Sequence, residues 1–113
     1  MAIIVHRIRL HDGVEPARFE TWVRDVDYAT CPELPSVVSF SVQRVVEESC
    51  ADAGPAVGGE SFHFFEVIEV TSREAFERDM RSAQFHKLVA EFGQMAKVVD
   101  EMAGERVGRG YTA

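Results

Sequence analysis

The chain has few cysteines, a shortage of positive charge and no long hydrophobic run. It holds two cysteines among 113 residues, and 12 lysines and arginines stand against 19 aspartates and glutamates, for a net charge of −7. Cys31 and Cys50 lack the close Cys/His spacing of metal sites, so no zinc site is indicated. The acidic balance argues against nucleic acid as a partner, because phosphate binding needs a basic surface.

Signatures of membranes and of nucleotide cofactors are also lacking. No apolar run approaches the roughly 20 residues that cross a bilayer, and the first residues have no secretion signal, so we expect a cytoplasmic protein with no membrane partner. No glycine-rich phosphate loop follows a predicted strand, and no nucleophile elbow is present. We therefore expect no cofactor and no metal, and chemistry carried by side chains in a cavity.

Hydrophobic periodicity predicts the elements of the first half of the chain. Residues 3–10 alternate as a strand with one wet face does. Pro16 suits the first turn of a helix, and a helical stripe follows it, which predicts a helix over 15–28. A second strand is predicted over 37–46. Its alternation places three apolar residues on one face: Val38, Phe40 and Val42.

The second half repeats the pattern after a segment of small residues. Residues 49–60 are predicted to form a loose hairpin connection, with a lid as the alternative. A third strand is predicted over 61–70, and a helix begins near Ser72, with Ser82 capping a fresh turn. A helical stripe continues to Met102 and leaves residues 105–107 as a short last strand. Val98 and Val99 offer an alternative start for that strand.

This order of elements predicts one α+β domain over 1–113, with the ferredoxin-like βαββαβ arrangement and both helices on one face of an antiparallel sheet. The other face would carry an apolar layer formed by Ile3, Val5, Phe65 and Val67. Pairing two such sheets across a two-fold axis would bury this layer, so we expect a homodimer, the dimeric α/β barrel.

Several segments together resemble the RedY-like (HapK-like) family of dimeric α/β barrel proteins. They are residues 4–8, 19–24, 27–32, 34–37, 62–69 and 102–106. The match covers nearly the whole chain outside 49–60, and the stretches 28–32 and 62–69 are its more specific parts. Members of the family accompany the biosynthesis of prodiginine tripyrroles and tryptophan-derived bisindoles. The resemblance thus implies a natural-product tailoring step on a small aromatic nitrogen heterocycle.

The strands bring together residues that can carry acid/base chemistry. His6 falls in the apolar layer of the first strand that faces the helices, and Glu66 falls in the same layer of the third strand. These two strands are neighbours in the predicted topology, so a His/Glu couple is expected. Such a couple in an apolar cavity can move protons at neutral pH, although a purely structural hydrogen bond is the alternative.

Further candidate residues come from the third strand and from the helices. His63 has the opposite strand phase. His86 comes one residue after Phe85 on the predicted second helix, where it either points into the mouth of the cavity or flanks the apolar stripe. Both are candidate catalytic residues beside His6 and Glu66. A substrate pocket for flat rings is predicted from aromatic residues: Trp22, Tyr28, Phe40, Phe62 and Phe64. The acidic series Glu15, Glu20, Asp25 and Asp27 is interpreted as a solvated helix face.

The sequence is compatible with three functions. The favoured one is a cofactor-independent cyclase that acts by proton transfer on a bisindole or pyrrole intermediate. The second is a cofactor-free monooxygenase, which would consume dioxygen. The third is a non-catalytic carrier of a labile intermediate, and the fold alone does not separate the three because one barrel hosts many activities.

Overall fold

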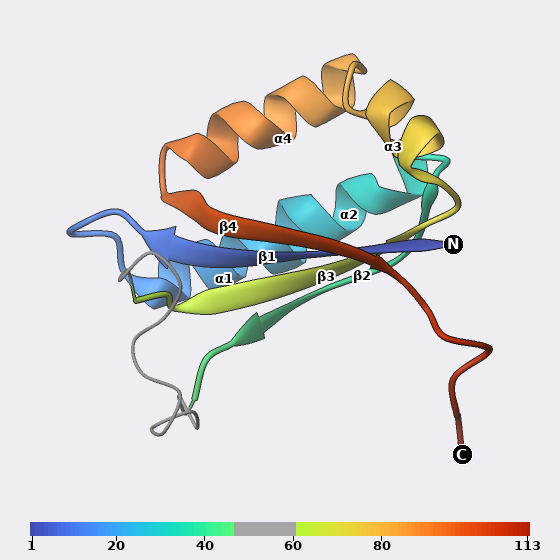
Figure 1. The fold of residues 1–113 in the computed structure, drawn as a ribbon. Helices are drawn as coiled ribbons and strands as arrows, with labels where there is room; N and C mark the ends of the chain where they lie inside the picture. The colour runs from blue at the N-terminus through green and yellow to red at the C-terminus, as the bar shows by residue number, and fades with distance from the viewer. Residues whose placement is uncertain (47–60) are drawn as a thin grey trace.

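The structure, a computed structural model, describes residues 1–46 and 61–113. The strands of this part form one antiparallel sheet in the order β2-β3-β1-β4. Their bounds are Ala2–Leu10 for β1, Val37–Arg44 for β2, Phe64–Val70 for β3 and Ala96–Glu105 for β4. All helices of the described residues lie on one face of the sheet (Figure 1). The predicted ferredoxin-like α+β fold is confirmed.

The first helical segment changes its winding along its length. It begins as α1 (Pro16–Trp22) with proline in the first turn, continues as a π turn over Val23–Asp27, and ends in α2 (Tyr28–Thr30) and a 3-10 turn over Cys31–Glu33. The Tyr28 amide donates to the Val23 carbonyl, which is the wider hydrogen bond of a π turn. The predicted helix over 15–28 is present, but its pitch is not uniform.

Within residues 1–46 and 61–113 the hydrophobic core is divided into two clusters. One contains Ile8 and Phe64, and the other contains Ile4 and Ile68. On β1 and β3 these pairs are separated by one inward-facing position each, and those positions hold His6 and Glu66. The polar pair therefore lies between two apolar clusters.

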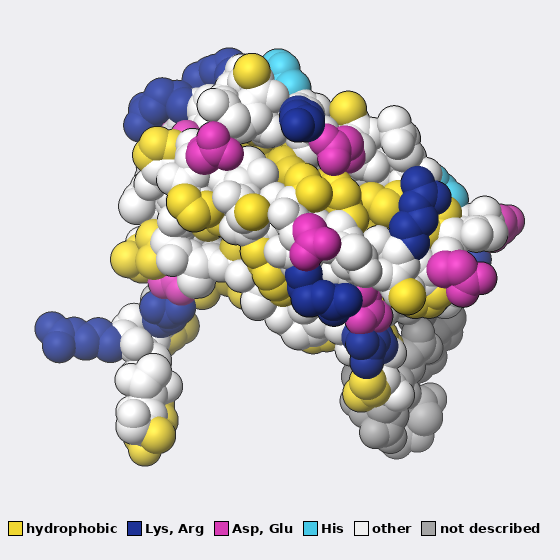
Figure 2. Space-filling model, turned by 180° about the vertical axis from the view of Figure 1, so that it is seen from behind, with side chains coloured by type: hydrophobic (Ala, Val, Ile, Leu, Met, Phe, Trp, Pro, Cys, Tyr) yellow, Lys and Arg dark blue, Asp and Glu magenta, His cyan; other side chains and the backbone are white. Residues whose placement is uncertain are grey.

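Seen from behind, the molecule shows a band of hydrophobic side chains with charged residues at its margins (Figure 2).

Two β-bulges change which side chains face the helices. One lies in β4, where the register with β1 shifts between Arg7 and Ile8 and leaves Val99 as the extra residue. The other lies in β2, where the register shifts between Val37 and Ser39. The predicted phase of Val38 is wrong, because the bulge leaves this side chain 48% exposed.

The C-terminal third differs most from the sequence prediction. The helices there are α3 (Arg73–Asp79) and α4 (Ala83–Gly93), and the hydroxyl of Ser82 accepts from the Phe85 amide, as its predicted cap role requires. The predicted helical stripe to Met102 is wrong, because β4 begins at Ala96. The short strand predicted over 105–107 is wrong as well, and the alternative start at Val98 and Val99 is nearer the observed one.

The sheet face opposite the helices carries the predicted apolar layer. Val5 of β1 pairs with Val67 of β3, and their neighbours on this face include Ile3 and Phe65. In the described part of the chain no helix covers this face (Figure 1). None of the described helices is long and apolar enough to cross a bilayer. The predicted connection over 49–60, with its alternative lid role, falls outside the described residues.

Candidate active site

A cavity of about 180 Å³ lies between the sheet and the helical layer. An apolar cavity of about 150 Å³ already accommodates a benzene ring, so this one has room for an aromatic group. Most of its wall is hydrophobic, and α4 contributes only apolar side chains to it: Phe85, Leu88, Val89 and Phe92. The polar side chains of the wall are few, and they are His6, Asp27, Cys31, Glu66, Arg73 and Glu101.

His6 stands at the centre of the site, with a carboxylate on each ring nitrogen. Its Nδ1 lies 3.4 Å from Oε1 of Glu66 on β3, and its Nε2 lies 3.0 Å from Oε2 of Glu101 on β4. The predicted adjacency of His6 and Glu66 is confirmed, and their catalytic role stays a prediction. Burial by itself lowers the pKa of His6, but the hydrogen bonds and charges of the two carboxylates outweigh it, so the pKa is raised.

Asp27 is the acidic group of the cavity that the sequence analysis misplaced. The interpretation of Asp27 as part of a solvated helix face is wrong, because its side chain lines the cavity opposite the sheet. It is the last residue of the π turn, four positions after the buried Val23, so the two side chains lie on the same side of the helical segment. Burial, with the charge of Glu66 second, raises the pKa of Asp27 to about 7. The carboxyl group is thus poised to give or take a proton near neutral pH.

Cys31 lies one turn beyond Asp27 on the same helical segment. Its Sγ is 3.4 Å from the Asp27 carbonyl oxygen, to which it donates. Burial, followed by the charges of Asp27 and Glu66, raises the pKa of the Cys31 thiol to about 11. The thiol therefore stays protonated at neutral pH, which does not suit a nucleophile.

Glu101 was also missed, and the β4 bulge explains how it reaches the site. Without the extra residue at Val99, strand alternation would turn Asp100 toward the helices; with it, Asp100 pairs with Arg7 on the outer face, and Glu101 turns inward. Nη1 of Arg73 lies 3.6 Å from Oε1 of Glu101. The hydrogen bond from His6 is the first cause that lowers the pKa of Glu101, and Arg73 adds to it.

Only part of the predicted aromatic pocket lines the cavity. Trp22 and Phe40 do, and Trp22 Nε1 donates to Glu91 Oε1 at 3.0 Å. Phe64 is buried in one core cluster instead, and Phe62 lies under the Arg7 guanidinium on the outer face. The predicted inward phase of Phe62 is wrong because β3 begins only at Phe64.

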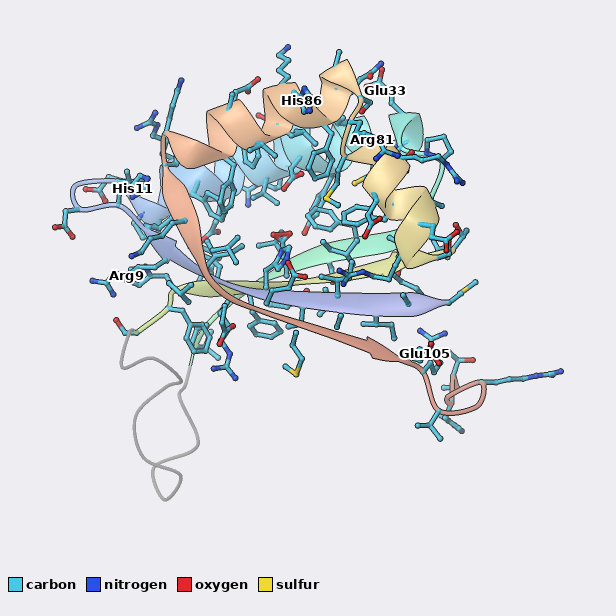
Figure 3. The ribbon with its side chains drawn as sticks, turned by 45° about the horizontal axis from the view of Figure 1, so that its top comes forward. Arg9, His11, Glu33, Arg81, His86 and Glu105 are labelled. Atoms are coloured by element: carbon cyan, nitrogen blue, oxygen red, sulfur yellow. The ribbon has the colours of Figure 1, made fainter. Side chains whose placement is uncertain are left out.

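Three other predicted residues also lie outside the cavity. The hydroxyl of Tyr28 accepts from the Val42 amide at 3.0 Å, and Tyr28 borders a second pocket that shares Cys31, Val37 and Phe40 with the cavity. His63 precedes β3, and its Nδ1 accepts from the Leu10 amide at 3.0 Å. His86 is exposed on α4, on the helix surface away from the sheet (Figure 3). The structure therefore brings His6 and Glu66 together and leaves His63 and His86 apart from them.

Sequence signals for the missed residues existed in part. Asp27 follows Val23 by four positions, which is helical spacing, so it could have been assigned to the apolar stripe. The inward direction of Glu101 depends on the β4 bulge, which the alternation of polar and apolar residues in the sequence does not reveal.

In the described residues no group of three or more His, Cys, Asp or Glu side chains is arranged to hold a metal ion.

The fold and the cavity define a ferredoxin-like α+β protein with an acid/base cluster in an apolar pocket. A family model described as REDY-like protein HapK matches residues 2–107. The chain is similar to the crystal structure of HapK from Hahella chejuensis, with 47% identity over 100% of this chain and 99% of that one, and a TM-score of 0.85. The chain belongs to the HapK family of REDY-like proteins.

More distant solved structures share the fold. One is SnoaB, described as a cofactor-independent oxygenase from Streptomyces nogalater, with 14% identity, a TM-score of 0.67, and coverage of 96% of this chain and 97% of that chain. Another is described as a dimeric ferredoxin-like protein of unknown function from Thermobifida fusca, with 14% identity, a TM-score of 0.64, and coverage of 91% and 86%. None of the curated proteins matches the chain significantly.

Proposed function

We propose that this protein is a cofactor-independent enzyme that catalyses a cyclase-type step, by acid/base catalysis, on an aromatic nitrogen heterocycle such as a bisindole or pyrrole intermediate. One observation carries the proposal: the cavity wall is mostly apolar, and His6, Glu66 and Asp27 line it. The family membership supports the substrate class through the resemblance already described.

The proposed chemistry uses two carboxyl groups that line the cavity, Asp27 on the helical side and Glu66 on the sheet side. Asp27 has a pKa of about 7, so at neutral pH it is protonated in about half of the molecules and serves as a donor or an acceptor. Glu66, held by His6 at 3.4 Å, is the proposed acceptor on the sheet side. A ring bound between them would lose a proton to one group and gain a proton from the other, which is what closing and rearomatising a heterocycle require.

Substrate binding is proposed to use the aromatic and aliphatic wall. Trp22 and Phe92 lie 6.4 Å apart between ring centroids, and with Phe40 they offer surfaces on which a flat ring can stack. Orientation of a reactive substrate in such a pocket lowers the barrier without a cofactor.

We also propose that the protein is a homodimer through the sheet face opposite the helices. Ile3, Val5, Phe65 and Val67 form an apolar layer there, and Met102 is 56% exposed beside it. The structure from Thermobifida fusca, described as dimeric, has the same fold and supports this arrangement. A solution mass of 12.6 kDa at micromolar protein concentration would contradict it.

A cofactor-free monooxygenase is the second candidate, favoured by the fold shared with SnoaB. The experiment that separates the candidates gives the purified protein a reactive bisindole intermediate and compares the products with and without protein, in air and under argon. The cyclase proposal predicts a protein-dependent product that forms equally in both atmospheres. Oxygen uptake would support the monooxygenase. Identical products with and without the protein would support the third candidate, a non-catalytic carrier of the intermediate.

A further inference from the structure

The two carboxylates that contact His6 differ in their access to solvent. The Glu66 side chain is 12% exposed and the His6 side chain 16%, whereas the Glu101 side chain is 51% exposed. His6 thus has an inner carboxylate on Nδ1 and an outer carboxylate on Nε2. The imidazole ring of His6 thus connects the buried Glu66 to the solvent-exposed Glu101.

We propose that Glu101 is the relay residue that exchanges protons between His6 and solvent during the acid/base reaction. The inference rests on the proposed function, because a relay is useful only where the inner groups take up or release protons. Glu101 acts through His6 and does not touch the substrate in this account, so its role is that of a positioning and relay residue.

In one transfer, a proton enters His6 from Glu101 and another leaves His6 for Glu66. Protonated Glu101 gives its proton to Nε2 of His6, and the Nδ1 proton of His6 passes to Oε1 of ionised Glu66. The result is ionised Glu101, neutral His6 with its proton on Nε2, and protonated Glu66. The reverse transfer restores the starting state, and only N–H and O–H bonds change.

Polar and charged groups face the cavity around His6 from the helical segment and from α3. Asp27 and Cys31 face the cavity from the helical segment, Arg73 faces it from α3, and the part of α4 that lines it is apolar. Arg73 contacts the second oxygen of Glu101 at 3.6 Å and leaves Oε2 to His6. The β4 bulge is what aims Glu101 inward, and bulges often re-aim side chains beside active sites.

The test measures the rate at which the His6 Nε2 proton exchanges with water, by NMR of the free protein with isotope-labelled histidine. Glu101→Gln keeps the size of the side chain but cannot accept the proton, so exchange should slow on the order of 10²-fold. Loss of the carboxylate also removes one of the causes that raise the pKa of His6. A more acidic imidazolium exchanges its proton faster. If Glu101 had a purely electrostatic or structural role, Glu101→Gln should therefore exchange the His6 Nε2 proton faster than the wild type, not more slowly.

Two further variants sharpen the result. Glu105→Gln is the matched control, because Glu105 lies on the same strand four residues on, away from His6 (Figure 3), and exchange should stay at the wild-type rate. Glu101→Ala opens space beside Nε2, so added formate should restore fast exchange in this variant but not in Glu101→Gln. Equal exchange in the wild type and Glu101→Gln, or no effect of formate, would overturn the relay. The relay and the enzymatic proposal can therefore fail independently, because this readout needs no substrate.

Discussion

Replacing Asp27 with asparagine should stabilise the folded protein at neutral and alkaline pH. The substitution keeps the shape of the side chain and removes its ionisation. An aspartate in an unfolded chain titrates near ~3.9, about three pH units below the value of about 7 that burial gives the pKa of Asp27 in the fold. Because one pH unit corresponds to about 1.36 kcal/mol, ionised Asp27 lowers the free energy of unfolding by at most about 4 kcal/mol.

The sign of the effect depends on pH in a defined way. Below about pH 4 the carboxyl is protonated in both states, and wild type and Asp27→Asn should be equally stable. As the pH rises toward the folded pKa of about 7, the unfolded chain ionises first, so the wild type loses stability that the variant keeps. The variant should therefore gain its full advantage only above that pH.

The assay is urea unfolding of both proteins at one protein concentration across this pH range. Asp25→Asn is the matched control, because Asp25 is exposed on the same helical segment, and its effect should stay within about 0.5 kcal/mol. A variant that is less stable than the wild type at pH 8, or a difference that does not change with pH, would show that Asp27 is not a buried, destabilising carboxyl group.

The other predictions concern the dimer and the cavity. Phe65→Ala should cost about 3–5 kcal/mol of stability and weaken the dimer if Phe65 is buried between subunits, and a loss well under 1 kcal/mol in urea unfolding would argue against that interface. Trp22 is the one tryptophan of the chain and lines the cavity, so its fluorescence should change when a pyrrole-containing aromatic ligand binds. Val89→Phe, at a half-exposed position of the cavity wall, should abolish that change, whereas Ala90→Phe on the next, exposed residue should not; equal responses would place the ligand elsewhere.

The parts of the fold that follow simple periodicity were predictable from the sequence. The alternation of β1 and β3 placed His6 and Glu66 in one layer, and the register confirms that they pair. The end of the chain was less predictable, because Val99 and Met102 continue the helical spacing of α4 by coincidence. Gly93, at the end of α4, was the available stop signal.

The two missed site residues have different causes. Asp27 lies four positions after the buried Val23, at helical spacing, but its charge favoured the interpretation of a solvated helix face. Glu101 is turned into the cavity by a β-bulge, which shifts the periodicity on which sequence interpretation relies. Phe62 was misassigned for a related reason, since it precedes β3 and does not follow the strand's alternation. The candidate site thus combines His6, Glu66 and Asp27, which regular spacing places, with Glu101, which a bulge places.

Turnover of a reactive bisindole intermediate, measured per folded protein, tests the central claim most directly. The claim is that His6 and Glu66 move the protons of the reaction in the cavity. His6→Ala and Glu66→Gln should each lose about 10²–10⁴-fold in rate while their melting temperatures show that they are folded. His63→Ala, which alters a histidine outside the cavity, should keep the wild-type rate. Wild-type turnover by folded His6→Ala and Glu66→Gln would contradict the account.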